Sequence, residues 1–366
     1  MKWPTTVDDK LMPQMAVKQR FVALDTYRGF IMLMLIQRSM FPSSARHPEL
    51  AWILTQFDHV EWEGVVFWDL IQPAFMFMVG IAMPFAIAHR LSQGATGRQI
   101  FYHVMYRMLK LVVLGQIIWS IATGQLSFYP IQVLSQIGLT YFVTFLILQI
   151  PYRLQILLAL LLLGIPWALF VLFPGSEGPF SKVDNIGLVI DRALFGINYP
   201  GHYMAIDLVG GTVITLFGAW TGIFLSRERP RSYILKILLT CAAMAFIISI
   251  TLELVNPIIK RLWTASFIFY STAWALLFLI GFYWLFKVKQ YRKLAFPFVV
   301  VGVNSIFIYC VSTLLRNWVG ESLNVFTHHL QFVSAFAPGL AKLILFVGVN
   351  WYLCYWLYQR KIFIKL

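Results

Sequence analysis

The sequence predicts an all-α, polytopic integral membrane protein, with about ten transmembrane helices in one bundle and both termini cytoplasmic. Of its 366 residues, 60% are apolar and 12% are charged, and the mean hydropathy is +0.75. Soluble domains are about half apolar and a quarter charged. The chain therefore carries more apolar surface than one soluble core can bury, and lipid is the solvent that fits it.

Apolar runs of about 20 residues mark the predicted spans. They lie near residues 26–42, 66–88, 104–123, 129–150, 154–173, 205–226, 232–253, 263–286, 295–314 and 339–358. Lys and Arg gather in the N-terminal segment 1–20, in alternate connections and in the C-terminal tail. The positive-inside rule places these parts in the cytoplasm. It also accounts for the formal net charge of +14, so the charge does not predict a nucleic-acid partner.

The chain is predicted to form a single transmembrane domain over residues 1–366, with two long outer connections at 43–65 and 174–204. Long connections between spans are more often functional than short ones. The first 20 residues are polar and basic, so we expect no cleavable signal peptide and the first span to direct insertion. The three cysteines lie in apolar runs at unrelated spacings and predict neither a disulfide framework nor a metal site.

Two pairs of ionisable residues at span ends are candidates for a functional site, because such residues are costly in a bilayer. Asp25 and Arg28 are three residues apart and share a helix face, so they can pair; they either anchor the first span or serve function. His59 precedes the second span and Asp69 lies just inside it. An imidazole suits proton transfer near neutral pH, and a carboxylate can orient it. The alternative is an interfacial histidine beside an aspartate that caps the helix.

Further polar side chains lie within predicted spans, and most of them are expected to join helices through hydrogen bonds. Asp207 differs, because a carboxylate at the outer end of a span needs a partner. Four glycines near it recur at helical spacing and predict close helix packing rather than a phosphate-binding loop: Gly210, Gly211, Gly218 and Gly222.

Several motifs occur in an order that is specific together, although each is weak alone. They are "ALDTYRGF" at 23–30 (preceded by Arg20), "HVEWEG" at 59–64, "DLIQPAFMFMVG" at 69–80, "VLSQIGLTY" at 133–141, Gly211–Thr212, "KRLWTASF" at 260–267 and "NSIFIY" at 304–309. Through them the chain resembles the transmembrane acyltransferases, in particular bacterial homologues of heparan-α-glucosaminide N-acetyltransferase. The resemblance covers nearly the whole chain, from about residue 20 to residue 315. It departs from the family pattern at Ser135–Gln136, Asp207 and Ser312.

The resemblance implies an acetyltransferase that uses cytoplasmic acetyl-CoA as co-substrate and acetylates an amine or hydroxyl of a saccharide on the outer side. It makes His59 the catalytic residue. Our own hypothesis from the chemistry of the residues is that Asp69 orients His59 and that Asn304 and Ser305 donate hydrogen bonds to the oxyanion. Residues assigned to the donor are Asp25, Arg28, Arg107, Gln136 and Thr212, of which the two arginines suit the nucleotide phosphates. Residues assigned to the acceptor are Glu61, Trp62, Asp207, Trp263 and Ser266. No metal is implied.

The expected location is the bacterial cytoplasmic (inner) membrane, with membrane lipid, acetyl-CoA and the saccharide as partners and a homodimer favoured by the family. The charge pattern places His59 on the outer side independently of the resemblance. A membrane transporter, or a lipid- or glycan-handling protein without acyl chemistry, is the alternative. The departure at Ser135–Gln136 also keeps open another acyl donor or a homologue without activity.

Overall fold

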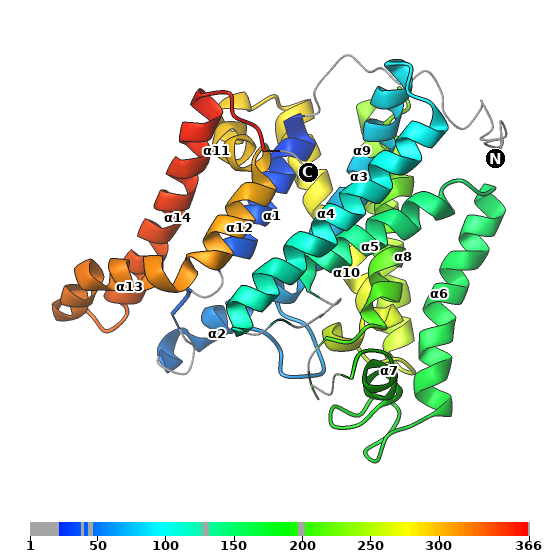
Figure 1. Cartoon of the computed structure of the whole chain (residues 1–366), viewed down its shortest axis with the longest axis horizontal. Coiled ribbons are helices and arrows are strands. Elements are labelled where there is room, and N and C mark those ends of the chain that lie inside the picture. Colours follow the sequence, from blue (N-terminus) through cyan, green and yellow to red (C-terminus); the bar gives the residue numbers. More distant parts are fainter. Residues whose placement is uncertain are drawn as a thin grey trace. The chain divides into compact units, whose positions relative to one another are not determined.

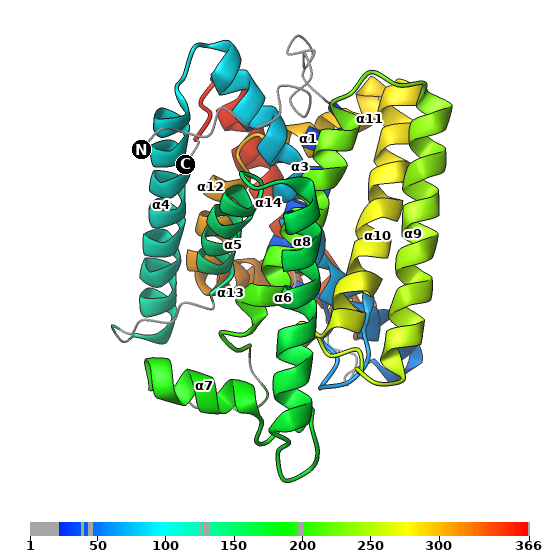
Figure 2. The same ribbon diagram turned by 90° about the vertical axis from the view of Figure 1, so that its right-hand side faces the viewer.

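The computed structural model describes residues 22–37, 40–42, 47–124, 126, 132–196, 201 and 203–364. Every regular element among these residues is a helix, which confirms the predicted all-α class (Figures 1 and 2). The predicted N-terminal segment 1–20, with Arg20, and parts of both long outer connections lie outside the described residues. The chain divides into two compact units, Met1–Arg20 with Glu61–Val65 and Met76–Ile280, and Phe21–Val60 with Val66–Phe75 and Gly281–Leu366. The single domain over residues 1–366 stays a prediction.

The first unit holds most of α3, the helices α4 to α9 and most of α10. Their bounds are α3 Ile71–Ser92, α4 Gly97–Thr123, α5 Val133–Ile147, α6 Tyr152–Leu172, α7 Ile186–Phe195, α8 Asp207–Leu225, α9 Arg231–Glu253 and α10 Ala265–Tyr283. Helix α5 packs against both α4 and α8, and α6 packs against α8; the two views of Figures 1 and 2 show α4 beside α5. Met83, Val104 and Phe145 belong to one buried cluster that joins α3, α4 and α5.

The glycines of α8 allow α3 and α8 to approach each other closely. A Cβ atom added to Gly218 would meet the backbone oxygen of Phe77, and one added to Gly222 would meet that of Ile81. Small residues at such crossings are typical of helix packing in membranes. The prediction that this glycine stripe serves packing is confirmed at these two positions.

The second unit holds the helices at the two ends of the chain. They are α1 Val22–Gln37, α2 Ala51–Leu54, α11 Arg292–Gly302, α12 Ser305–Leu314, α13 Arg316–Thr327 and α14 Ala337–Gln359. Helix α1 packs against α11, α12 and α14, and α13 packs against α14. The crossing of α1 and α11 is again made by glycines, because a Cβ atom on Gly29 would meet the backbone oxygen of Phe298.

All ten predicted spans contain a helix, but not all of these helices are long enough to cross a membrane. Seven are long and apolar enough among the described residues: Phe67–Ser92, Gly97–Thr123, Tyr152–Leu172, Asp207–Leu225, Arg231–Glu253, Ala265–Val288 and Ala337–Gln359. Helices α11 and α12 make an eighth candidate, bent by 60° between them. Helix α5 has 15 residues and α1 has 16. The fold is therefore that of a polytopic membrane protein, while the count of ten and the cytoplasmic termini stay predictions.

Candidate functional site

His59 and Asp69 form a close side-chain pair where the second predicted span begins. The His59 Nδ1 atom lies 2.6 Å from Asp69 Oδ1. The Asp69 side chain is 1% exposed and that of His59 is 12% exposed. A carboxylate buried to this degree requires compensation by charge or hydrogen bonds, and the imidazole supplies one such bond. The structure thus brings together the two residues that the sequence assigned to acid–base chemistry.

The second carboxylate oxygen of Asp69 holds the backbone around the pair. It accepts hydrogen bonds from the backbone N–H groups of Val66, at 3.2 Å, and Val60, at 3.4 Å. Asp69 therefore caps the 3₁₀ turn Phe67–Leu70 that leads into α3 and also contacts His59, while its role in proton transfer stays a prediction. An ionised carboxylate only accepts hydrogen bonds, so Nδ1 of His59 carries the hydrogen and Nε2 of the neutral ring carries the lone pair.

Asn304 and Ser305 lie at the bend between α11 and α12. The Asn304 side chain donates to the backbone oxygen of Ile362, at 3.1 Å, and accepts from the backbone N–H of Ile364, at 2.9 Å. Its amide therefore fixes the C-terminal segment, a structural role of the kind expected for polar side chains within spans, although the sequence did not indicate this partner. Ser305 is the first residue of α12 and is 9% exposed. The oxyanion role of these residues stays a prediction.

Asp25 and Arg28 form the ion pair that their spacing predicts, with Arg28 Nη1 3.6 Å from Asp25 Oδ1. Both side chains are partly exposed, at 17% for Asp25 and 29% for Arg28. Their Coulomb interaction is consequently weaker than that of a buried pair. The charge of Arg28 already has a partner within its own helix.

The three other residues assigned to the donor lie on neighbouring helices of the first unit. Arg107 is on α4, Gln136 on α5 and Thr212 on α8. The Arg107 guanidinium lies 4.6 Å from the centre of the Tyr141 ring. Its Nε atom is buried and has no hydrogen-bond partner in the part of the chain that the structure describes. Thr212 bonds within its own helix, to the oxygen of Leu208. Because α5 packs against both α4 and α8, these residues belong to one helix group.

Glu61 and Trp62 are held by the second outer connection. Lys182 Nζ lies 2.6 Å from Glu61 Oε1, and this hydrogen bond keeps the pKa of Glu61 below its usual value. The Trp62 indole N–H donates to the backbone oxygen of Phe180, at 2.9 Å, and Gly64 N–H donates to that of Ile258, at 2.8 Å. Both assigned acceptor residues therefore also fasten the loop that runs from His59 to Asp69 in the chain.

The remaining acceptor candidates lie at or next to the N-terminal ends of α8 and α10. Asp207 is fully buried. Its Oδ2 atom accepts from Met204 N–H, at 3.0 Å, while Oδ1 has no hydrogen-bond partner among the described residues. Trp263 adopts a left-handed backbone conformation, with φ of 45°, which is rare for a bulky residue and is frequent at functional sites. Ser266 donates to the backbone oxygen of Pro257.

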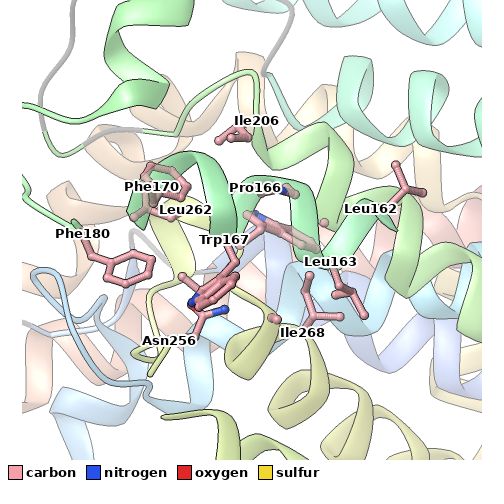
Figure 3. Close-up of a pocket in the computed structure, with 14 residues that line it drawn as sticks. Leu162, Leu163, Pro166, Trp167, Phe170, Phe180, Ile206, Asn256, Leu262 and Ile268 are labelled. Carbon is pink, nitrogen blue, oxygen red and sulfur yellow. The ribbon is translucent and has the colours of Figure 1, made fainter. Parts of the chain in front are cut away.

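A small cavity adjoins Trp263 beneath the outer connections. Its volume is about 10 Å³, which is room for one water molecule. Figure 3 shows its wall of aromatic and aliphatic side chains, among them Phe170 and Phe180. Two lining residues have buried polar atoms without a hydrogen-bond partner, Asn256 Oδ1 and the indole N–H of Trp263. One acceptor and one donor in a cavity of this size fit an ordered water rather than a sugar ring.

Asp191 of α7 is a buried acid that the sequence analysis missed. Its carboxylate accepts from Ala205 N–H, at 2.9 Å, and lies within electrostatic range of Asp207. Burial raises the pKa of Asp191 to about 6. Only its place in the long connection 174–204 pointed to it, because no motif surrounds it.

We expect the Asp191→Asn variant to gain thermal stability relative to the native protein at pH 7.5 more than at pH 4.5. The folded state holds the Asp191 proton up to pH about 6, whereas the unfolded chain releases it near pH 4. The folded state then binds more protons in this interval, so this group lowers stability as the pH rises through it. Asparagine keeps the acceptor oxygen and removes the charge. Melting temperatures at both pH values test this.

Asp184 provides the control with the opposite sign. The Ser176 backbone N–H and the Ser181 hydroxyl hold the pKa of this carboxylate below its usual value. The stability that it contributes is therefore present at neutral pH and lost as the pH falls. Asp184→Asn should lower the melting temperature by similar amounts at pH 7.5 and pH 4.5, because both values lie above the usual carboxylate pKa near 4, and should lower it less at about pH 3. Equal pH dependence of the two variants would contradict the assignment to Asp191.

Among the described residues, no group of three or more His, Cys, Asp or Glu side chains is placed to hold a metal ion. Cys241, Cys310 and Cys354 are free thiols.

Helices long enough to cross a membrane, together with a histidine in contact with a buried carboxylate at the start of one of them, define a polytopic membrane protein with a candidate acid–base site. The chain resembles heparan-α-glucosaminide N-acetyltransferase. It is 23% identical to the Homo sapiens protein over 418 aligned positions, which cover 96% of this chain and 60% of that protein. It is 22% identical to the Mus musculus protein over 429 positions, covering 99% and 63%. The chain thus spans about three fifths of the length of these relatives. No protein-family model matches it.

Proposed function

We propose that the protein is a transmembrane acetyltransferase. In this proposal it moves an acetyl group from cytoplasmic acetyl-CoA to an amine or hydroxyl of a saccharide on the outer side of the membrane. The observation that carries the proposal is the 2.6 Å contact of His59 Nδ1 with the buried Asp69 carboxylate, in a chain that resembles proteins named N-acetyltransferases along nearly its whole length. A bacterial inner-membrane location and a homodimer belong to the same proposal.

His59 acts as general base through Nε2. That nitrogen takes the proton from the acceptor as the acceptor nitrogen or oxygen attacks the thioester carbonyl, and Asp69 stabilises the resulting imidazolium. The carbon–sulfur bond breaks, and the imidazolium returns the proton to the departing sulfur, so the products are acetylated acceptor and free thiol. The same nitrogen can instead carry the acetyl group transiently. Ser305, next to Asn304, supplies a hydroxyl donor for the carbonyl oxygen.

The donor supplies an acetyl thioester joined to a phosphate-rich nucleotide, and the first unit contains residues that suit it. The Arg107 guanidinium has no carboxylate partner among the described residues, and its buried Nε atom lacks a hydrogen-bond partner. Guanidinium groups bind phosphate oxygens through paired N–H donors. Gln136 and Thr212 lie on α5 and α8, and α5 packs against both α8 and the helix α4 that carries Arg107. On the acceptor side, Glu61, Trp62, Asp207, Trp263 and Ser266 are proposed to contact or support the saccharide.

Binding of acetyl-CoA to the purified protein tests the proposal. A ligand that binds only the folded state raises the melting temperature. At a ligand concentration one hundred times its Kd, the free energy of unfolding increases by about 2.7 kcal/mol. We expect stabilisation by acetyl-CoA and CoA but not by ATP, and slow acetyl-CoA hydrolysis or exchange. A transporter without acyl chemistry gives neither hydrolysis nor exchange. No shift at millimolar acetyl-CoA would overturn the proposal.

A further inference from the structure

A row of basic side chains runs along α4 from the end of α3. His103, Arg107 and Lys110 are spaced four and three residues apart, so they lie on one face of α4. Arg90, in the last turn of α3, places Nη2 2.8 Å from His103 Nε2. A guanidinium can only donate, so His103 accepts at Nε2 and keeps its hydrogen on Nδ1. We name these four residues the α4 basic cluster.

The α4 basic cluster has no acidic counterpart among the described residues. None of its members takes part in the ion pairs of those residues. The sequence itself contains no Asp or Glu between Asp69 and Glu177. His103 is within electrostatic range of Arg90, Arg107 and Lys110, so three like charges gather around one imidazole. An anion from outside this segment would stabilise such a group.

The position of Arg107 indicates that this anion is a ligand bound within the protein and not a headgroup of the surrounding lipid. Arg107 lies ten residues into α4, about 15 Å along a helix about 40 Å long, where charged side chains are rare and mark functional sites. Its guanidinium packs on Tyr141 of α5, a residue that is 3% exposed. In contrast, Arg98 lies over the exposed ring of Tyr102, as expected for an interfacial anchor.

We propose that the α4 basic cluster binds the phosphate groups of the nucleotide end of CoA. This inference rests on the proposed function only in that the donor is a CoA thioester. Arg90 and Arg107 offer paired N–H donors, Lys110 a mobile positive charge, and His103 its Nδ1–H. The two arginines considered for this role differ in their partners: Asp25 already balances Arg28, whereas no carboxylate of the described residues pairs with Arg107.

Calorimetric titration of the full-length protein in phosphatidylcholine nanodiscs tests the assignment. CoA and pantetheine are titrated into the native protein and into the Arg90→Gln and Arg107→Gln variants. The matched control is Lys236→Gln, which removes an exposed cation from α9 in the same unit. We expect each cluster variant to weaken CoA binding about tenfold to hundredfold, because hydrogen bonds to charged groups are lost. Pantetheine, which lacks the nucleotide, and the control should show no such loss.

Salt and lipid complete the test. The Kd of CoA for the native protein should rise with salt while that of pantetheine does not, which supports the inference even if a variant fails to fold. CoA binding that is equal in native protein and both folded variants would overturn the cluster assignment and leave the donor proposal standing. If CoA does not bind but phosphatidylglycerol binds the native protein and not the variants, a lipid headgroup is the phosphate source. That result overturns both the assignment and the donor.

Discussion

Replacing His59 by alanine is expected to lower the rate of acetyl transfer by about 10²- to 10⁴-fold, the contribution of a positioned general base. The fold should persist, because Asp69 keeps its backbone donors Val66 and Val60. Binding of the donor should also persist, since no donor contact is assigned to His59. The measurement is transfer of labelled acetyl from acetyl-CoA to a glucosamine-containing acceptor in proteoliposomes, with the acetyl-CoA thermal shift recorded alongside.

His328→Ala serves as the matched control for His59→Ala. His328 is an exposed histidine in the 3₁₀ turn His328–Phe332 that follows α13, and its Nδ1 atom bonds only to the backbone oxygen of Asn324 among the described residues. Its removal should leave transfer unchanged. Transfer at the native rate in a folded His59→Ala protein would remove His59 from the mechanism and favour the reading of an interfacial residue.

The sequence predicted where helices occur better than how far each extends. Apolar composition locates all ten segments, because burial and lipid exposure both select apolar residues. It does not show where a helix bends. The window 295–314 is continuous in hydropathy, yet the helix breaks between Gly302 and Ser305, where the amide of Asn304 turns to the C-terminal segment. That contact joins residues 58 positions apart, and a local window cannot detect it.

At the candidate site, the residue types were predictable and their secondary contacts were not. A histidine and an aspartate that flank the start of a span suggest a proton-transfer pair from chemistry alone, and the structure places them in contact. Asp191 could not be predicted as a candidate, because its burial and its hydrogen bond with Ala205 N–H are apparent only in the folded structure. The basic row on α4 was predicted only through Arg107, because positive charge near a cytoplasmic loop ordinarily reflects topology. Its lack of acidic partners becomes informative only when the helices are assembled.

The Asp69→Asn variant should lose nearly as much transfer activity as His59→Ala, although it changes a residue that need not touch substrate. An asparagine in place of Asp69 can present its N–H₂ group to Nδ1, which then becomes the acceptor and moves the ring hydrogen to Nε2. The base is thereby in the wrong tautomer. The corresponding change beside the catalytic histidine of a serine protease lowers kcat by about 10⁴-fold. We expect a loss of about 10³- to 10⁴-fold here by the same reasoning.

If Asp69 orients His59, the Asp69→Asn variant should have nearly the native melting temperature, because asparagine retains an oxygen that can accept from Val66 N–H. Its transfer rate should fall, and the pH profile of the rate should lose the limb that reports the imidazole. The matched control is Asp58→Asn, which alters an exposed neighbour that accepts only from the backbone N–H of His59 among the described residues. That change should preserve both rate and pH profile. A parallel drop in melting temperature and rate for Asp69→Asn, with the native pH profile retained, would make Asp69 a helix cap and leave His59 without its orienting partner.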